Sequence, residues 1–245
     1  MLKILALVAA LLPPQDHAAD PVKALAEAAK RLAELESYSW TLKVENQDSQ
    51  VAARQGLRQE LPSLAPLSGS RTRSGFTVLK LAGPGGPTSA VLKLNKAVFE
   101  TSTGWKLAQA LSREKEPRAF FFSTVLALYP MPPDQLPGLL EGISELRKVR
   151  EGEYAGKLSP AAARALLEWT LRGGGMADIP EIKDASGQIG IQTAKGILAK
   201  YSVQAKGSVT VVDVPTILRR TLQVAMMEVN AVKVDAPAEA KKKLE

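Results

Sequence analysis

The sequence contains no cysteine and, apart from His17 near its start, no histidine. The absence of cysteine excludes disulfide bonds, thiolate nucleophiles, iron–sulfur clusters and zinc sites with cysteine ligands. Aromatic residues are also few, at 5% of the 245 residues, whereas 45% are hydrophobic and 23% are charged. This balance is typical of an ordinary globular protein, and the length allows one large domain or two small ones.

The first residues have the layout of a secretory signal. Lys3 supplies a positive start, residues 4–12 are an unbroken apolar run, and a proline-containing stretch then ends in Ala18 and Ala19. The apolar run is far shorter than the roughly 20 residues that a helix needs to cross a bilayer. We therefore expect residues 1–19 to be a cleaved signal peptide and the protein to be periplasmic or secreted, with a buried N-terminal segment as the alternative. Because no cysteine follows the run, a lipid-anchored bacterial lipoprotein is excluded.

Loss of residues 1–19 would remove the single histidine and leave the formal net charge at +7, because Lys3 and Asp16 leave together. The mature chain would then lack the side chain best suited to proton transfer near neutral pH and the two commonest transition-metal ligands. We therefore expect a non-enzymatic protein without a metal ion or other cofactor. A hydrolase based on serine or carboxylates stays open as an alternative.

A helix followed by a strand is predicted directly after residue 19. Asp20 and Pro21 are typical of a helix start, and apolar residues then recur at helical spacing to about Glu36. The period then changes to two, which predicts a strand with one buried face over residues 38–45. The side chains of that buried face are Tyr38, Trp40, Leu42 and Val44.

The rest of the chain divides into blocks of strands and helices. A first block of strands, too closely spaced for crossover helices and therefore antiparallel, is predicted at 76–81, 89–94 and 97–101. A helical block with one short strand at 154–158 is predicted at 117–130, 134–143 and 159–171. Strands return at 188–192, 198–205, 207–212, 221–229 and 232–234, before a charged tail at 238–245 that we expect to fray. This order predicts an α+β fold with an antiparallel sheet covered on one face.

The element order also resembles that of the LolA-like superfamily, which includes periplasmic lipoprotein carriers and mycobacterial lipid-binding lipoproteins. The resemblance covers residues 20–237 and rests on the first helix leading into Tyr38-Ser39-Trp40-Thr41, a meander containing Phe99 and Gly104-Trp105, and the closing Val232-Lys233-Val234-Asp235-Ala236-Pro237. It implies a single domain built on a strongly curved antiparallel half-barrel. Helices would cover the concave face, with a helical insertion at about 117–172, and the apolar cavity could hold acyl chains.

On this resemblance, apolar side chains of the concave face would bind a lipid or other hydrophobic ligand. The predicted ligand-binding residues are Tyr38, Trp40, Leu42, Val44, Phe76, Val78 and, on a covering helix, Phe121. The alternative is that the same side chains fill one another's space as a closed core. The protein would then be a structural or regulatory interaction module of the cell envelope.

Three short patterns that are associated with chemistry do not support an enzyme or a metal site. Ser112-Arg113-Glu114-Lys115 matches the Ser-x-x-Lys string of penicillin-binding enzymes, but the accompanying strings are missing. Asp178, Glu181 and Asp184 lack the spacing of a calcium-binding EF-hand loop. The glycines at 173–175 are not followed by the Gly-Lys-Ser/Thr of a phosphate-binding loop.

The positive net charge raises nucleic acid or an anionic surface as partners. The basic residues are dispersed along the chain and form no aromatic-plus-basic motif, so we expect no nucleic acid. For an exported protein, an anionic membrane surface, a wall polymer or an envelope protein is the expected partner. We expect a monomer.

Overall fold

The computed structural model describes residues 20–50, 61, 65–83, 86–94, 96–111, 131–211 and 213–245. The predicted signal peptide, the predicted helix at 117–130 and Phe121 lie outside these residues. None of the helices within the described ranges is both long and apolar enough to cross a membrane.

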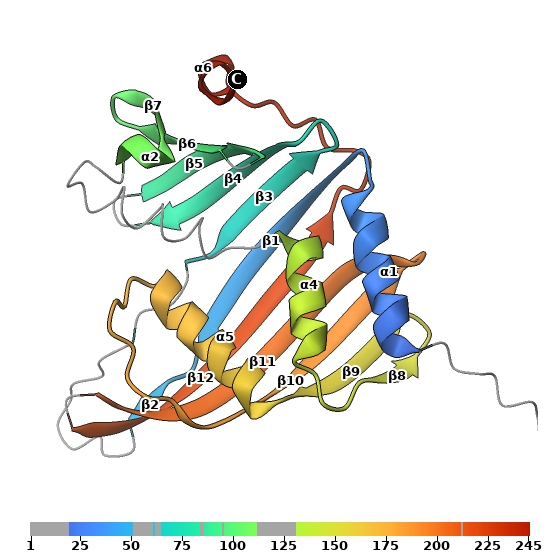
Figure 1. Cartoon of the computed structure of the whole chain (residues 1–245), viewed down its shortest axis with the longest axis vertical. Coiled ribbons are helices and arrows are strands. Elements are labelled where there is room, and N and C mark those ends of the chain that lie inside the picture. Colours follow the sequence, from blue (N-terminus) through green and yellow to red (C-terminus); the bar gives the residue numbers. More distant parts are fainter. Residues whose placement is uncertain are drawn as a thin grey trace, which may run out of the picture.

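A single large antiparallel sheet forms the framework of the fold (Figure 1). Its strands are β1 (Ser37–Asn46), β2 (Ser49–Gln50), β3 (Leu67–Thr72), β4 (Phe76–Gly83), β5 (Gly86–Lys93), β6 (Lys96–Thr101), β7 (Gly104–Leu107), β8 (Arg147–Arg150), β9 (Glu153–Leu158), β10 (Lys183–Ala194), β11 (Ile197–Val211) and β12 (Val214–Met227). They lie in the order β7-β6-β5-β4-β3-β1-β12-β11-β10-β9-β8, with β2 paired to β12. The central position of β1 follows from its pairing with β3 on one side and with the last strand, β12, on the other.

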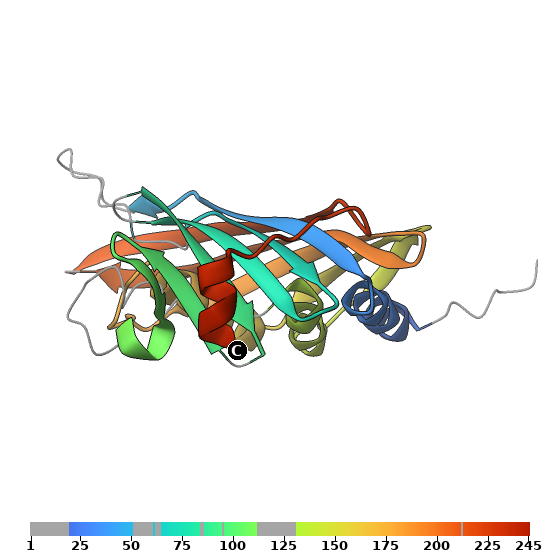
Figure 2. The same cartoon turned by 90° about the horizontal axis from the view of Figure 1, so that it is seen from above.

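The sheet is open, because β7 and β8 form its two edges. It is also curved (Figures 1 and 2). Strands β3 to β7 lie across the top of Figure 1, and β12 to β8 form its lower part. The prediction of an α+β fold with a strongly curved antiparallel sheet covered by helices is confirmed.

Helices lie on both faces of the sheet. They are α1 (Pro21–Ala33), α2 (Ala108–Leu111), α4 (Pro132–Glu141), α5 (Pro160–Gly173) and α6 (Ala238–Leu244). Helices α1, α4 and α5 cover the same face, which we call the inner face (Figures 1 and 2). Helix α6 packs on the opposite, outer face, over β5 to β7.

Two of the predicted helix starts, at residues 20 and 159, are confirmed at the level of single hydrogen bonds. The Asp20 carboxylate accepts a hydrogen bond from the Val22 backbone N–H (3.0 Å) at the start of α1. The Ser159 hydroxyl accepts one from the Ala162 N–H (3.2 Å) at the start of α5. Each cap satisfies a backbone donor that the helix itself leaves free.

The prediction of two strands at 198–205 and 207–212 is wrong, because β11 runs without a break from Ile197 to Val211. Gly207 is not a strand breaker here. A Cβ at this position would lie 2.8 Å from the Ile182 side chain and 3.0 Å from that of Leu167 on α5. Glycine therefore lets the helix approach the sheet closely.

The end of the chain also differs from the prediction. Strand β12 ends at Met227, and Glu228 and Asn230 follow with positive φ angles of 46° and 56°, so residues 232–234 form no strand. The tail expected to fray instead forms α6, whose Ala240 and Leu244 are buried against the outer face. The apolar residues of this short helix outweigh its run of lysines.

The insertion between β7 and β10 contributes strands as well as helices. Strands β8 and β9 extend the sheet at its edge beside β10. Helix α4 passes through Pro137 and Gly138, although both residues are poor helix formers. Both residues are exposed, so the missing Pro137 N–H faces the solvent side of the helix.

Candidate functional site

The inner face brings together the first four residues of the predicted ligand-binding wall. Tyr38, Trp40 and Leu42 are buried side by side on β1, and Val44 packs against the same cluster. The Tyr38 and Trp40 rings lie 5.6 Å apart between centroids. These four residues share one face because side chains alternate along a strand.

Trp40 is held by an unusually close neighbour on β3. Gly69 pairs directly with Trp40, and a Cβ on Gly69 would lie 2.2 Å from the indole ring. Only glycine at this position leaves room for the indole. The close approach explains how so large a side chain reaches 0% exposure in the centre of the sheet.

Phe76 and Val78 do not belong to this wall. They pack against the cluster of the outer face, which α6 covers, whereas Leu79 and Leu81 of the same strand belong to the inner face. The prediction that both residues lie on the inner face is wrong, because alternation along a strand identifies two faces but not which one the helices cover. The covering residue Phe121 lies outside the described residues.

A buried arginine that no sequence motif indicates lies on the inner face. Arg220 of β12 is 1% exposed, and its Nη1 donates a hydrogen bond to the Asp48 carboxylate, with which it forms an ion pair. Its Nε and Nη2 have no hydrogen-bond partner in the part of the chain that the structure describes. The alternation of β12, with Leu218 and Leu222 on either side, is the only sequence signal that places this arginine inward.

The Nε and Nη2 groups form one edge of the guanidinium and point in nearly parallel directions. Such an edge can bind both oxygens of a carboxylate or phosphate. Buried polar groups in proteins are nearly always hydrogen-bonded, so two free donors on one buried side chain call for an acceptor. The edge therefore offers a recognition point for an acceptor group on a ligand.

A second unpartnered polar atom lies on the same face. Within the described ranges the buried Tyr38 hydroxyl makes no hydrogen bond. Burial raises the pKa of Tyr38, and the charge of nearby Arg71, its cross-strand neighbour, only partly opposes this rise. Tyr38 and Arg220 sit towards opposite ends of the β1–β12 pair, since Tyr38 precedes the paired segment and Arg220 faces Asn46.

The Tyr38→Phe variant should lose less stability than the wild type when the pH is raised into the alkaline range. With the pKa raised in the folded state, the unfolded chain releases the phenolic proton first, near its ordinary pKa of 10.0. The contribution of Tyr38 is thus intact below that pH and is lost as the pH rises through the folded-state pKa. Urea unfolding at about pH 8 and about pH 11 should show a smaller loss for the variant than for the wild type. Equal losses in the two proteins would contradict this assignment.

A buried polar contact ties helix α4 to the inner face. The Tyr201 hydroxyl of β11 donates a hydrogen bond to the Gln135 side-chain carbonyl, and both residues are buried. Leu136 and Leu140 of α4 lie in the same apolar cluster. The contact of α4 with the inner face is therefore mainly apolar, and the Tyr201–Gln135 hydrogen bond helps to orient the helix.

Open hollows of about 590, 620 and 650 Å³ lie on the outer face of the lower sheet. The first is lined by residues that include Thr41, Lys43, Gly190, Ser202 and Gln223. Polar side chains on this face pair with each other, as Gln188 does with Gln204 (2.7 Å). Apolar side chains such as that of exposed Val149 also line the first hollow, so its lining is mixed.

The patterns considered for metal binding or catalysis gain no support from the geometry. In the described part of the chain, no three histidine, cysteine, aspartate or glutamate side chains gather as metal ligands. Glu181 forms an exposed ion pair with Lys183 (3.5 Å). The Ser112 to Lys115 string lies outside the described residues.

No protein-family model and no curated protein matches the chain. Among solved structures, it is similar to the lipoprotein LppX of Mycobacterium tuberculosis, with 11% identity over 88% of this chain and 98% of LppX and a TM-score of 0.45. It is also similar to LprF of Mycobacterium bovis, with 9% identity over 90% of this chain and 97% of LprF and a TM-score of 0.42.

Proposed function

We propose that the protein is an exported, non-enzymatic binder of a lipid or other hydrophobic ligand, held between the inner face and its helical cover. The observation that carries the proposal is buried Arg220, whose Nε and Nη2 have no hydrogen-bond partner among the described residues and which lies beside the apolar side chains of the inner face. A closed core normally leaves no such donors unpaired, because an unpaired buried donor costs free energy. An amphipathic ligand would supply the missing acceptor.

The ligand chemistry follows from the two parts of the site. The apolar stretch of Trp40, Leu42 and Val44 on β1 suits a hydrocarbon chain. Eight residues of strand span about 26 Å, which is long enough for an acyl chain. The free edge of Arg220 suits the carboxylate or ester oxygens at the end of such a chain.

Native mass spectrometry of gently purified protein tests the proposal directly. We expect an added mass that corresponds to a lipid and that disappears after denaturation and refolding in lipid-free buffer. Refolded protein fed with fatty acid should regain the mass. Its absence from both the native and the lipid-fed samples would contradict the proposal.

A fluorescent polyene fatty acid tests the role of Arg220. We expect the double variant Asp48→Ala/Arg220→Met, which removes the buried charges together, to bind it about 10- to 100-fold more weakly than the wild type, as expected for losing hydrogen bonds between charged groups. The methyl ester of the same polyene is the matched control and should lose much less affinity. Equal losses of affinity for the acid and the ester would show that Arg220 does not bind the carboxylate of the fatty acid.

The complete burial of Tyr38, Trp40 and Leu42 favours a second candidate, an envelope interaction module with a filled core. Such a module would carry no lipid in either the native or the lipid-fed sample. The mass spectrum therefore separates the two candidates.

A further inference from the structure

The turn between β5 and β6 carries an exposed leucine. Leu94 is 91% exposed, the highest value among the large hydrophobic residues of the described chain, and its φ of 54° lies in the left-handed region. That region is rare for residues other than glycine, asparagine and aspartate. A leucine there gains nothing from the turn itself, and single exposed apolar residues are common, so its surroundings decide its meaning.

Those surroundings are basic on both sides of the turn. Lys93 and Lys96 form the last residue pair of the hairpin, so their side chains lie on the same, outer face. The Lys93 ammonium lies 4.8 Å from the centre of the half-buried Phe76 ring. The tip thus combines an apolar end, an aromatic ring and two cations.

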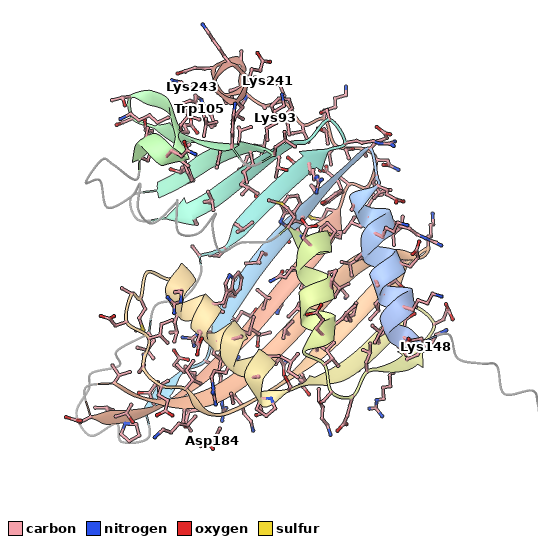
Figure 3. All side chains as sticks on the ribbon, in the orientation of Figure 1. Lys93, Trp105, Lys148, Asp184, Lys241 and Lys243 are labelled. Atoms are coloured by element: carbon pink, nitrogen blue, oxygen red, sulfur yellow. The ribbon has the colours of Figure 1, made fainter. Side chains whose placement is uncertain are left out.

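Helix α6 adds three more lysines beside the turn. The Lys96 ammonium donates hydrogen bonds to the backbone carbonyls of Leu244 (3.3 Å) and Glu245 (3.4 Å), which places the end of α6 at the hairpin tip. Ala240 and Leu244 face the sheet, and Lys241 to Lys243 lie between them on the outer side. Figure 3 shows Lys93, Lys241 and Lys243 around α6, close to Trp105.

The three carboxylates of this region, on Asp235, Glu239 and Glu245, offset part of the charge of the five lysines and leave a net positive charge. Asp235 forms an ion pair with Lys241 (3.5 Å), and Glu239 accepts a hydrogen bond from the Trp105 backbone N–H (3.3 Å) near the start of α6. Glu245 is exposed at its end. Lys242 and Lys243 are exposed, and within the described residues neither forms an ion pair that would oppose the attraction of an anionic surface.

We propose that this surface, made of Leu94, Lys93, Lys96 and Lys241 to Lys243, docks onto an anionic phospholipid bilayer. Lysines attract the protein to anionic headgroups, and an apolar side chain that enters the interface adds the hydrophobic contribution. A soluble polyanion would use the lysines but would leave Leu94 in water. The proposal does not depend on the ligand of the inner face, since that ligand lies on the other side of the sheet.

Vesicle co-sedimentation of the full chain tests docking. We expect binding to mixed phosphatidylglycerol and phosphatidylcholine vesicles, weakened by salt, and much weaker binding to phosphatidylcholine alone. Lys242→Gln/Lys243→Gln should weaken binding about thirtyfold, at roughly fivefold for each lysine near the surface, and Leu94→Gln should weaken it about tenfold. The matched control Lys195→Gln/Lys206→Gln removes two exposed lysines from the other half of the sheet and should change binding less than about twofold.

Because the chain has no cysteine, an introduced cysteine is its only site for a thiol-reactive dye. Such a dye can report whether position 94 enters the bilayer. The emission of an environment-sensitive dye attached to the Leu94→Cys variant should shift to shorter wavelength when the protein binds mixed vesicles. Lys195→Cys with the same dye is the control, because Lys195 also occupies an exposed hairpin turn with positive φ, and it should not shift.

Three outcomes would overturn the proposal. They are no binding to mixed vesicles, equal losses in the α6 and control variants, and lysine-dependent binding without any effect at Leu94. The last would identify a purely electrostatic surface. Loss of docking with an intact lipid mass, or the reverse, would separate this proposal from that of the inner-face ligand.

Discussion

Trp40→Ala is expected to lower the free energy of unfolding by about 3–5 kcal/mol, the range for removing a fully buried large aromatic side chain. Trp40 is 0% exposed in the middle of the inner face, where its ring contacts the tilted ring of Tyr38 and packs against the backbone of Gly69. Few neighbours can move into the space that the indole leaves, because the β1 and β3 backbones are fixed by their hydrogen-bond ladder. Chemical denaturation at neutral pH measures the loss.

Gly69 supplies the control for this prediction. Gly69→Val alone should also destabilise the protein, since a Cβ would lie 2.2 Å from the indole ring. In the Trp40→Ala background the valine instead enters the vacated space, so the double variant should be more stable than the sum of the two losses implies. Simple additivity would contradict the described contact.

Lipid uptake by the Trp40→Ala variant also bears on the proposed function. Altered uptake would indicate that the indole borders a ligand, whereas unchanged uptake would favour a filled core. The same protein samples serve the stability and uptake measurements.

Asp48→Ala should destabilise the fold by about 3–5 kcal/mol, because it leaves a buried guanidinium without its counter-charge. The Arg220 side chain is 0% exposed and that of Asp48 is 10% exposed, so solvent screens the pair poorly. Asp48 also accepts a hydrogen bond from the Arg219 backbone N–H (3.2 Å), which alanine loses as well. Denaturant unfolding of the variant checks the loss.

Arg220→Met in the Asp48→Ala background is the test of this cause. Removing both charges should restore most of the stability, since an apolar side chain of similar length replaces a buried ion pair. Asp235→Ala, which breaks an ion pair with a 94% exposed carboxylate, should leave stability within error of the wild type. Failure of Arg220→Met to rescue would show that Asp48 acts through its backbone contact instead.

Local patterns in the sequence predicted most of the individual elements. The Asp20 cap and the alternation of β1 both depend on neighbouring residues alone. Predictions failed where a local signal had another cause. Gly207 is a site of close helix packing and not a break, and the lysine-rich tail contains two apolar residues that find a partner surface.

The candidate site was only partly predictable for a related reason. Tyr38, Trp40, Leu42 and Val44 share a face by alternation along one strand, and the structure keeps them together. Whether Phe76 belongs with them depends on the register of β4 and on which face the helices cover, and it lies on the other side. Alternation within a strand does not carry that information.

The sequence by itself determined what chemistry the chain lacks, where most helices and strands lie, and that they build an α+β fold. Only the tertiary structure decided that Asp48 meets Arg220 across 172 positions of the chain, that α6 covers the outer face, and which apolar residues line the inner one. The physical reason is the separation along the sequence of the residues that interact. Caps, turns and periodicity are set by residues a few positions apart, whereas burial and charge pairing depend on which strands become neighbours.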